Sequence, residues 1–249
     1  MDTLAAGLEQ DPSSRHAVES LSVMDLPSFV LGRNSPTIGI WKSFRNAQDS
    51  WEQGRLDGVE PVTGVPRSLL DVFATVADEP ENDVALRFWS WQDGGGDHAQ
   101  RQLWDCWRLS GILDVRRRQR YSNIDFTPTA QGDDEPKDSA PDTETILCRL
   151  MEAIKAVHQA FSTPCPENLP FYNDLVYPLM TISLEVSHLK RRPDWKQTLD
   201  EVRCRIGENR PFKLARIAFK LLDDAWLGES FDFDIEDAAR EMVVEIALL

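Results

Sequence analysis

The sequence lacks the closely spaced cysteines and histidines that hold zinc. Its four cysteines lie too far apart for a Cys-x-x-Cys pair, and its four histidines are isolated from one another. We therefore expect no metal site, and we expect the cysteines to be buried side chains of a protein in a reducing compartment. We expect His158 and His188 on helix faces. The cysteines are Cys106, Cys148, Cys165 and Cys204.

Long hydrophobic runs and the common catalytic motifs are also missing. No stretch is long and apolar enough to span a membrane, and residues 1–20 lack the apolar centre of a secretory signal. Neither GxGxxG nor GxxxxGK[ST] occurs, and GxSxG and HExxH are absent as well. We therefore expect an intracellular protein without catalytic or cofactor-binding residues and without a membrane partner.

Positive charge is scarce in this chain. It has 42 acidic and 27 basic residues, which gives a formal net charge of −15. Phosphates of nucleic acids and anionic membranes repel such a protein. We therefore expect no specific DNA binding by this chain alone.

Apolar residues at helical spacing are abundant. After Pro66, for example, Leu69, Leu70, Phe73 and Val76 fall on one helix face. Alternating strand patterns and Asn-Gly hairpin signals are absent. The sequence therefore predicts an all-α, multi-helix fold. The expected helices cover about 66–76, 82–91, 98–120, 146–161, 174–190, 193–206, 211–227 and 234–249, with Gly111 marking a kink or a close helix contact.

Composition also suggests how the chain is divided. Residues 1–28 are polar and predict a mostly unstructured N-terminal arm, with one short helix near 15–24. Residues 29–249 are expected to form the all-α domain, in which the aromatic-rich stretch 36–51 docks on the core. A flexible acidic loop at about 127–143, with three prolines and five acids, interrupts this domain.

Two basic clusters stand out from the acidic background. Each lies near an expected helix C-terminus, where cations interact favourably with the helix dipole, so a purely structural role accounts for both. A nuclear-import or partner-docking patch is the functional alternative. The clusters are Arg116, Arg117, Arg118 and Arg120, and Lys190, Arg191 and Arg192.

Acidic and aromatic residues offer two further interpretations. A magnesium-dependent isoprenoid cyclase would hold a diphosphate through acidic clusters, and only Asp223-Asp224 and Asn173-Asp174 resemble such clusters. Both lack the further ligands of that pattern, and they occur in the reverse order. The tryptophans lie at spacings that suit a core. The alternative is that they line a hydrophobic pocket for a small-molecule effector. Those at helical spacing are Trp89, Trp91, Trp104 and Trp107.

Several motifs, taken in order, resemble one protein family. The chain is similar to the fungal-specific regulatory domain of binuclear zinc-cluster transcription factors over residues 60–249. That resemblance implies an all-α domain that restrains, dimerises or responds to effectors. The motifs are Thr63-Gly-Val-Pro-Arg-Ser-Leu-Leu-Asp71, a tryptophan-rich helix that ends in an arginine run, Tyr177-Pro-Leu-Met180, Arg192-Pro-Asp-Trp195 and the stretch Phe231–Leu248.

One departure from the family bears on mechanism. Such factors carry a six-cysteine zinc cluster ahead of this domain, and residues 1–60 contain no cysteine. We therefore expect a nuclear transcription regulator, either a shortened paralogue or a gene product without its first exons. It would act through proteins of the transcription machinery or through a homo- or heterodimer. The alternatives are a non-transcriptional interaction protein of the same fold and the cyclase-like enzyme.

Overall fold

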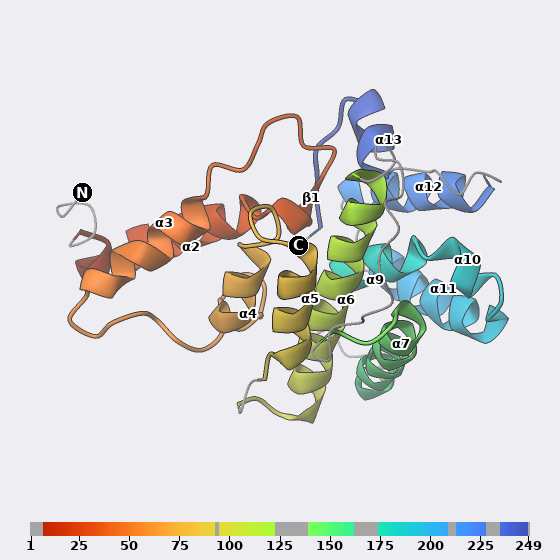
Figure 1. Ribbon diagram of the computed structural model, residues 1–249, viewed down its shortest axis with the longest axis horizontal. Coiled ribbons are helices and arrows are strands. Elements are labelled where there is room, and N and C mark those ends of the chain that lie inside the picture. The colour runs from red at the N-terminus through yellow and green to blue at the C-terminus, as the bar shows by residue number, and fades with distance from the viewer. Residues whose placement is uncertain are drawn as a thin grey trace.

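Helices dominate the computed structural model, which describes residues 7–92, 95–122, 139–161, 174–208, 213–227 and 235–248 (Figure 1). The all-α prediction is confirmed. A short antiparallel pair of strands, β1 (Val30–Leu31) and β2 (Ile246–Ala247), and two 3-10 turns, η1 (Pro27–Phe29) and η2 (Gln48–Ser50), accompany the helices. The α-helices are α2 (Pro12–Met24), α3 (Ile40–Ala47), α4 (Arg67–Phe73), α5 (Glu81–Ser90), α6 (His98–Ser122), α7 (Thr143–Ala160), α9 (Val176–Ser183), α10 (Val186–Leu189), α11 (Pro193–Glu208), α12 (Lys213–Leu227) and α13 (Ile235–Glu241).

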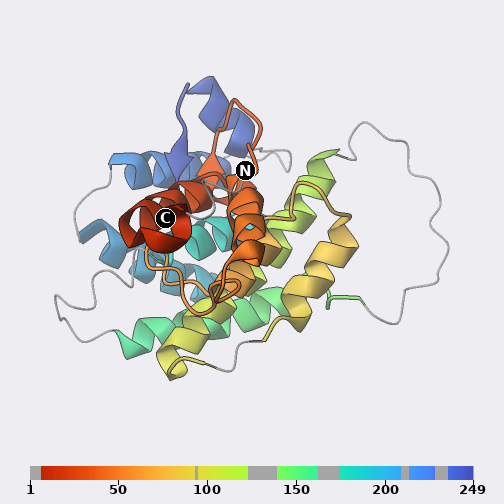
Figure 2. The same cartoon turned by 90° about the vertical axis from the view of Figure 1, so that its left-hand side faces the viewer.

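Helix α6 lies at the centre of the molecule and contacts α5, α7 and α9 (Figures 1 and 2). Its apolar side chains are buried on several faces, as in Leu103, Trp107 and Leu113, because neighbours surround it. Helix α7 begins where Asp142 accepts a hydrogen bond from the Thr145 backbone N–H at 2.8 Å. None of the helices within the described ranges combines the length and the apolar character needed to cross a membrane.

Aromatic rings from five separate elements meet in the core. Phe29, Phe73, Phe88, Trp107 and Tyr177 are all buried, and their contacting ring centroids lie 4.7 to 6.2 Å apart. Most of these pairs are tilted or edge-to-face, which the charge distribution of aromatic rings favours. The predicted core role of the tryptophans is confirmed for Trp107 and also for Trp104, whereas Trp89 and Trp91 are half-buried against the core.

The short helix predicted near residues 15–24 is present as α2, which is longer than predicted, and the N-terminal segment packs on the core through Val23 and Leu26. Helix α2 begins at Pro12, where the Asp11 carboxylate accepts a hydrogen bond from the Ser13 backbone N–H at 3.0 Å. Its buried face includes Val23 but also Glu19, which is only 2% exposed. Glu19 forms a two-pronged ion pair with Arg67 at 2.5 and 3.0 Å. A charged residue is therefore tolerated on the buried face of α2, because Arg67 pairs with Glu19.

The stretch 36–51 docks on the rest of the chain as predicted. Trp41 is buried in the main core, and its indole N–H donates to Asp71 at 2.8 Å. Phe44 and Trp51 belong to a smaller apolar cluster with Leu8, which joins α3 to the N-terminal segment. This cluster lies beside α2 and α3, at the left of Figure 1.

The prediction of one helix over 234–249 is wrong beyond residue 241. Helix α13 ends at Glu241, and Val243 adopts a left-handed backbone conformation with φ of 55° that an α-helix does not accommodate. The following residues pair with β1, in the register Val30 opposite Ala247 and Leu31 opposite Ile246. In this C-terminal segment Ile246 and Leu248 are buried, whereas Val243 is 82% exposed. The expected helical stripe therefore contained residues that do not share a face.

Gly111 lies at a close helix contact between α6 and α5, one of the two roles predicted for it. A Cβ atom at this position would lie 2.6 to 2.9 Å from three ring atoms of Phe88 on α5. Phe88 is fully buried, so its ring has little room to move away.

We therefore expect Gly111→Ala to destabilise the fold by about 1 to 3 kcal/mol, because overpacking outweighs the helix propensity of alanine, which favours it by about 1 kcal/mol. Urea unfolding measures the loss. Combining Gly111→Ala with Phe88→Leu should restore part of it. A stabilised single variant would contradict the close contact.

Candidate functional site

The first basic cluster, at the end of α6, is buried at Arg117, half-buried at Arg116 and Arg118, and exposed at Arg120. Asp114 is 1% exposed and accepts hydrogen bonds from Arg117 at 2.5 Å and from Arg118 at 3.1 Å. Burial raises the pKa of Asp114, but Arg118 and Arg117 together outweigh burial and hold that pKa below its ordinary value. Arg118 also donates to the Pro27 carbonyl at 3.0 Å. Arg118 therefore connects α6 to the N-terminal segment.

The other two arginines of this cluster also bind internal partners. Arg116 donates to the carbonyls of Ala140 and Pro141, at 3.2 and 2.5 Å. Arg120 pairs with Glu185 at 2.6 Å. Glu185 lies where the structure breaks the helix predicted over 174–190 into α9 and α10, and its carboxylate is buried at this break. This geometry favours a structural role for Arg116, Arg117, Arg118 and Arg120.

The second basic cluster remains on the surface. Lys190, Arg191 and Arg192 are exposed in the turn between α10 and α11. Arg192 pairs with Glu144 at 3.1 Å and lies over the ring of Trp195 at 4.9 Å. A nuclear-import or docking patch is therefore better supported at these three residues than at the end of α6.

The motifs that carry the family resemblance are used mainly in packing. Thr63 is buried, and its backbone N–H and its hydroxyl both donate to Glu60 at 2.7 Å. Asp71 accepts two hydrogen bonds from Arg45, both at 3.0 Å. Tyr177 opens α9 inside the aromatic cluster. Residues 231–234 of the last motif and residues 127–138 of the acidic loop lie outside the described residues.

Among the acids of the cyclase alternative, Asp223 is engaged in an ion pair, whereas its neighbour Asp224 is exposed. Asp223 forms a two-pronged ion pair with Arg203 at 2.6 and 2.7 Å. Asp174 is half-buried beside Gly64, and burial raises the pKa of its carboxyl to about 7. Asn173 lies outside the described residues. Across the described ranges, no group of three or more His, Cys, Asp or Glu side chains could hold a metal ion.

The raised pKa of Asp174 predicts a pH dependence of stability. Its folded-state pKa of about 7 lies above the ordinary value of 3.8, so the folded protein binds this proton more tightly than the unfolded chain does. Stability is therefore lost as the pH rises from about 4 to about 7. We expect Asp174→Asn to gain up to about 3 kcal/mol over wild type between pH 5 and pH 8. Urea unfolding at both pH values measures this, and parallel pH profiles would contradict it.

Cysteine burial follows the prediction only in part. Cys106 is buried and Cys148 is half-buried, whereas Cys204 is exposed on α11. Burial raises the pKa of the Cys106 thiol well above its ordinary value, which keeps it protonated. Cys165 lies outside the described residues. Cys204 differs because it falls on the outward face of a helix whose inward stripe holds the apolar residues.

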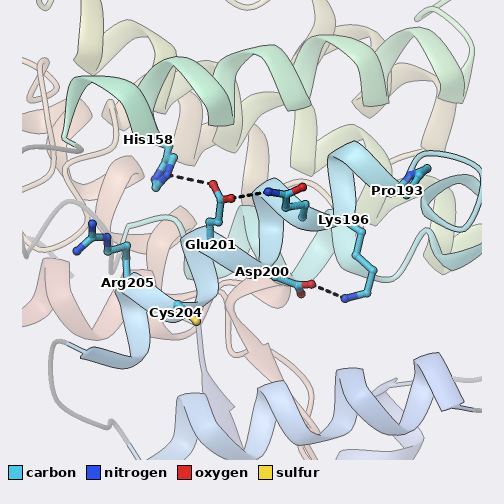
Figure 3. Close-up of a pocket in the computed structure, with 8 residues that line it drawn as sticks. His158, Pro193, Lys196, Asp200, Glu201, Cys204 and Arg205 are labelled. Atoms are coloured by element: carbon cyan, nitrogen blue, oxygen red, sulfur yellow. Dashed lines mark hydrogen bonds and ion pairs between the residues drawn. The ribbon is translucent and has the colours of Figure 1, made fainter.

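Helix α11 forms a ridge with hollows on both sides. Its buried stripe consists of Trp195, Leu199, Val202 and Ile206. On the α7 side lies an open hollow of about 610 Å³ (Figure 3). There His158 points from α7 toward Glu201 on α11 at 3.9 Å, and Gln197 donates to the same carboxylate at 3.0 Å. The histidine is thus on a helix face, as expected, and next to an exposed acid.

The hollow on the α12 side has an apolar floor. It has a volume of about 280 Å³, and Leu179, Leu199, Leu222 and Trp226 contribute to its lining. The Trp226 indole N–H donates to the Ser183 carbonyl at 3.1 Å, which orients the ring. A neighbouring hollow continues along α12 over Arg216, Phe219 and Lys220. We call these two hollows together the α11–α12 groove.

Ion pairs and cation–π contacts border the α11–α12 groove. Lys196 pairs with Asp200 at 2.6 Å, and its ammonium lies 5.0 Å from the centre of the Trp226 ring. Arg203 pairs with Asp223 and lies over Phe219 at 4.8 Å. The charged side chains are therefore engaged with one another above apolar surface, an arrangement that suits contact with another molecule.

Sequence reasoning did not single out this groove. The available signals were the Lys196–Asp200 pair and the cations Arg216 and Lys220, each pair spaced by one helical turn in an acidic chain. Comparison with models of protein families, with curated proteins and with solved structures finds no match. The chemistry of the groove itself is therefore the basis for its interpretation.

Proposed function

We propose that this chain regulates transcription through an α-helical protein-interaction domain, similar to the regulatory domain of fungal zinc-cluster transcription factors. The order of the family-like motifs supports the transcriptional role. The α11–α12 groove supports action through protein contact, and this is the observation on which the proposal mainly depends. Its partners would be proteins of the transcription machinery or a second subunit.

The size and chemistry of the groove favour protein contact over catalysis. Its charged residues form mutual ion pairs, as between Arg203 and Asp223, instead of converging on a reacting centre. The groove consists of two open, adjoining hollows of about 280 and 540 Å³ along α12, not one enclosed cavity. An extended partner that covers both hollows fits this surface better than an enclosed effector does.

Nuclear location is part of the proposal and depends on the exposed cluster Lys190, Arg191 and Arg192. Because these cations are consecutive and accessible, they suit recognition by an acidic import receptor. Fusing the chain to a fluorescent protein tests this. The variant Lys190→Glu/Arg191→Glu should lose nuclear enrichment, whereas Arg101→Glu, at another exposed position, should keep it.

A tethering experiment tests the transcriptional role. The 249-residue chain is fused to an unrelated DNA-binding domain that carries its own nuclear-import signal, and reporter transcription is measured. We expect a change relative to the DNA-binding domain alone. A folded nuclear fusion with no effect would favour the non-transcriptional interaction protein. Selection from random DNA duplexes with the untethered chain should enrich no sequence, because its charge of −15 opposes phosphate contact.

A further inference from the structure

The α11–α12 groove presents apolar surface at a point where the chain is otherwise strongly charged. Leu179, Leu199 and Leu222 form its buried floor. At one end Leu227, the last residue of α12, is 82% exposed. A leucine so exposed beside a hollow with an apolar floor offers a partner further apolar contact.

The charge balance of the groove is opposite to that of the whole chain. Asp200 and Asp223 are already paired with Lys196 and Arg203. Two further cations, Arg216 and Lys220, are exposed one helical turn apart on α12 and border the same groove. Neither forms an ion pair with any residue that the structure describes. The groove therefore carries an excess of positive charge in a protein with a net charge of −15.

We infer that the α11–α12 groove binds an acidic amphipathic helix of a partner protein. This inference depends on the proposed function, because it names the kind of partner through which the domain would act. Leucine or phenylalanine side chains of the partner would cover the hollow over Leu222 and Trp226, and its carboxylates would face Arg216 and Lys220. From Arg216 to Leu227, α12 is about 17 Å long, which matches about three helical turns of a partner.

Other occupants fit the groove less well. A second copy of the chain would bring another charge of −15, so repulsion would oppose its approach. A nucleic acid would contact the two cations, but its phosphates would gain nothing from the apolar floor and would meet the same repulsion. An acidic helix contacts both the apolar floor and the two cations. Because it is small, the positive charge of the groove attracts it more than the net charge of the chain repels it.

The test is binding of a synthetic probe to the full chain. The probe is a labelled peptide of about 14 residues, with leucines at i, i+4 and i+7 and glutamates at the positions that flank this leucine stripe. Fluorescence anisotropy should report saturable binding that weakens as salt rises from about 50 to about 300 mM. The same peptide with lysine in place of glutamate should not bind, and preferential binding of the lysine peptide would overturn the inference.

Charge reversal locates the binding surface. Arg216→Glu/Lys220→Glu should weaken binding by at least about tenfold, and the neutral Arg216→Gln/Lys220→Gln variant should lie between it and wild type. The matched control Arg101→Glu/Arg149→Glu changes net charge equally at exposed positions elsewhere and should bind as wild type does. An equal loss of peptide binding in the two charge-reversed double variants would overturn the inference, because binding would then depend on the overall charge of the chain. Circular dichroism checks that all variants fold.

Two further readouts separate this inference from its rivals and from the proposed function. Dimerisation of the chain in sedimentation, abolished by Arg216→Glu/Lys220→Glu, would overturn the inference in favour of a second copy. If the peptide does not bind and the tethered reporter responds equally with and without these substitutions, the inference that the groove binds a helix is refuted. The proposed transcriptional role is then unaffected. Groove-specific binding with a silent reporter would support the groove and refute the transcriptional role.

Discussion

The variant Asp114→Ala should lose about 3 to 5 kcal/mol of folding stability, because removing this buried carboxylate takes away the ion-pair partner of the desolvated Arg117. Asp114 is 1% exposed, and the Arg117 side chain beside it is 11% exposed. Without Asp114, Arg117 would keep its charge in a desolvated position. Urea unfolding monitored by circular dichroism measures the loss.

The pair Asp105–Arg108 provides a matched control on the same helix. It has the same three-residue spacing and a distance of 2.8 Å, but the Asp105 side chain is 38% exposed. Asp105→Ala should therefore cost less than about 1 kcal/mol, since water screens the exposed carboxylate and the half-buried Arg108 keeps its hydrogen bonds to the carbonyls of Phe88 and Trp89. Similar losses in the two variants would contradict the buried network. Such a result would support the alternative interpretation, in which the arginine run of α6 is a surface docking patch.

The arginine run illustrates what a sequence can and cannot predict. Four cations near a helix end are compatible with a dipole contact, an import signal or a buried network. The choice depends on partners that are distant in sequence, such as Pro27 for Arg118 and Glu185 for Arg120. Only the assembled fold brings these groups together.

The central helices were predictable because local and tertiary preferences agree there. Helix α6 begins at His98 as expected, and α7 follows the apolar stripe that starts near Ile146. The two ends of the chain were not predictable in this way. Glu19 is buried because Arg67 matches its charge, and Ile246 lies in a strand because Leu31 pairs with it. Both partners lie far along the chain.

The candidate site shows the same division. The boundaries of α11 and α12 follow from prolines and apolar spacing, as at Pro193. The groove between them depends on how the two helices pack against α9. This packing brings Leu179 into the same hollow as Leu222 and Trp226. Periodicity identifies which face of a helix is buried but not which neighbour buries it.

Phe29 anchors the N-terminal segment in the core. Its ring is fully buried and lies 4.8 Å from Phe73, 5.2 Å from Trp107 and 5.3 Å from Tyr177. Its carbonyl accepts a hydrogen bond from the Leu248 backbone N–H at 3.0 Å, so the C-terminal strand segment is attached at Phe29. We expect Phe29→Ala to destabilise the protein by about 3 to 5 kcal/mol, since it opens a large cavity among rings that cannot all move.

Phe44→Ala is the matched control for Phe29→Ala, because it makes the same substitution outside the main core. Phe44 is 3% exposed in the small cluster with Leu8 and Trp51, and its nearest aromatic rings lie 6.2 and 6.3 Å away. Its loss should be smaller, because the surrounding segment is free to collapse on the vacated space. Thermal and urea unfolding of both variants provide the comparison. Equal or reversed losses would mean that Phe29 does not hold the N-terminal segment in the core, and that residues 12–28 behave as the separate arm that their polar composition suggests.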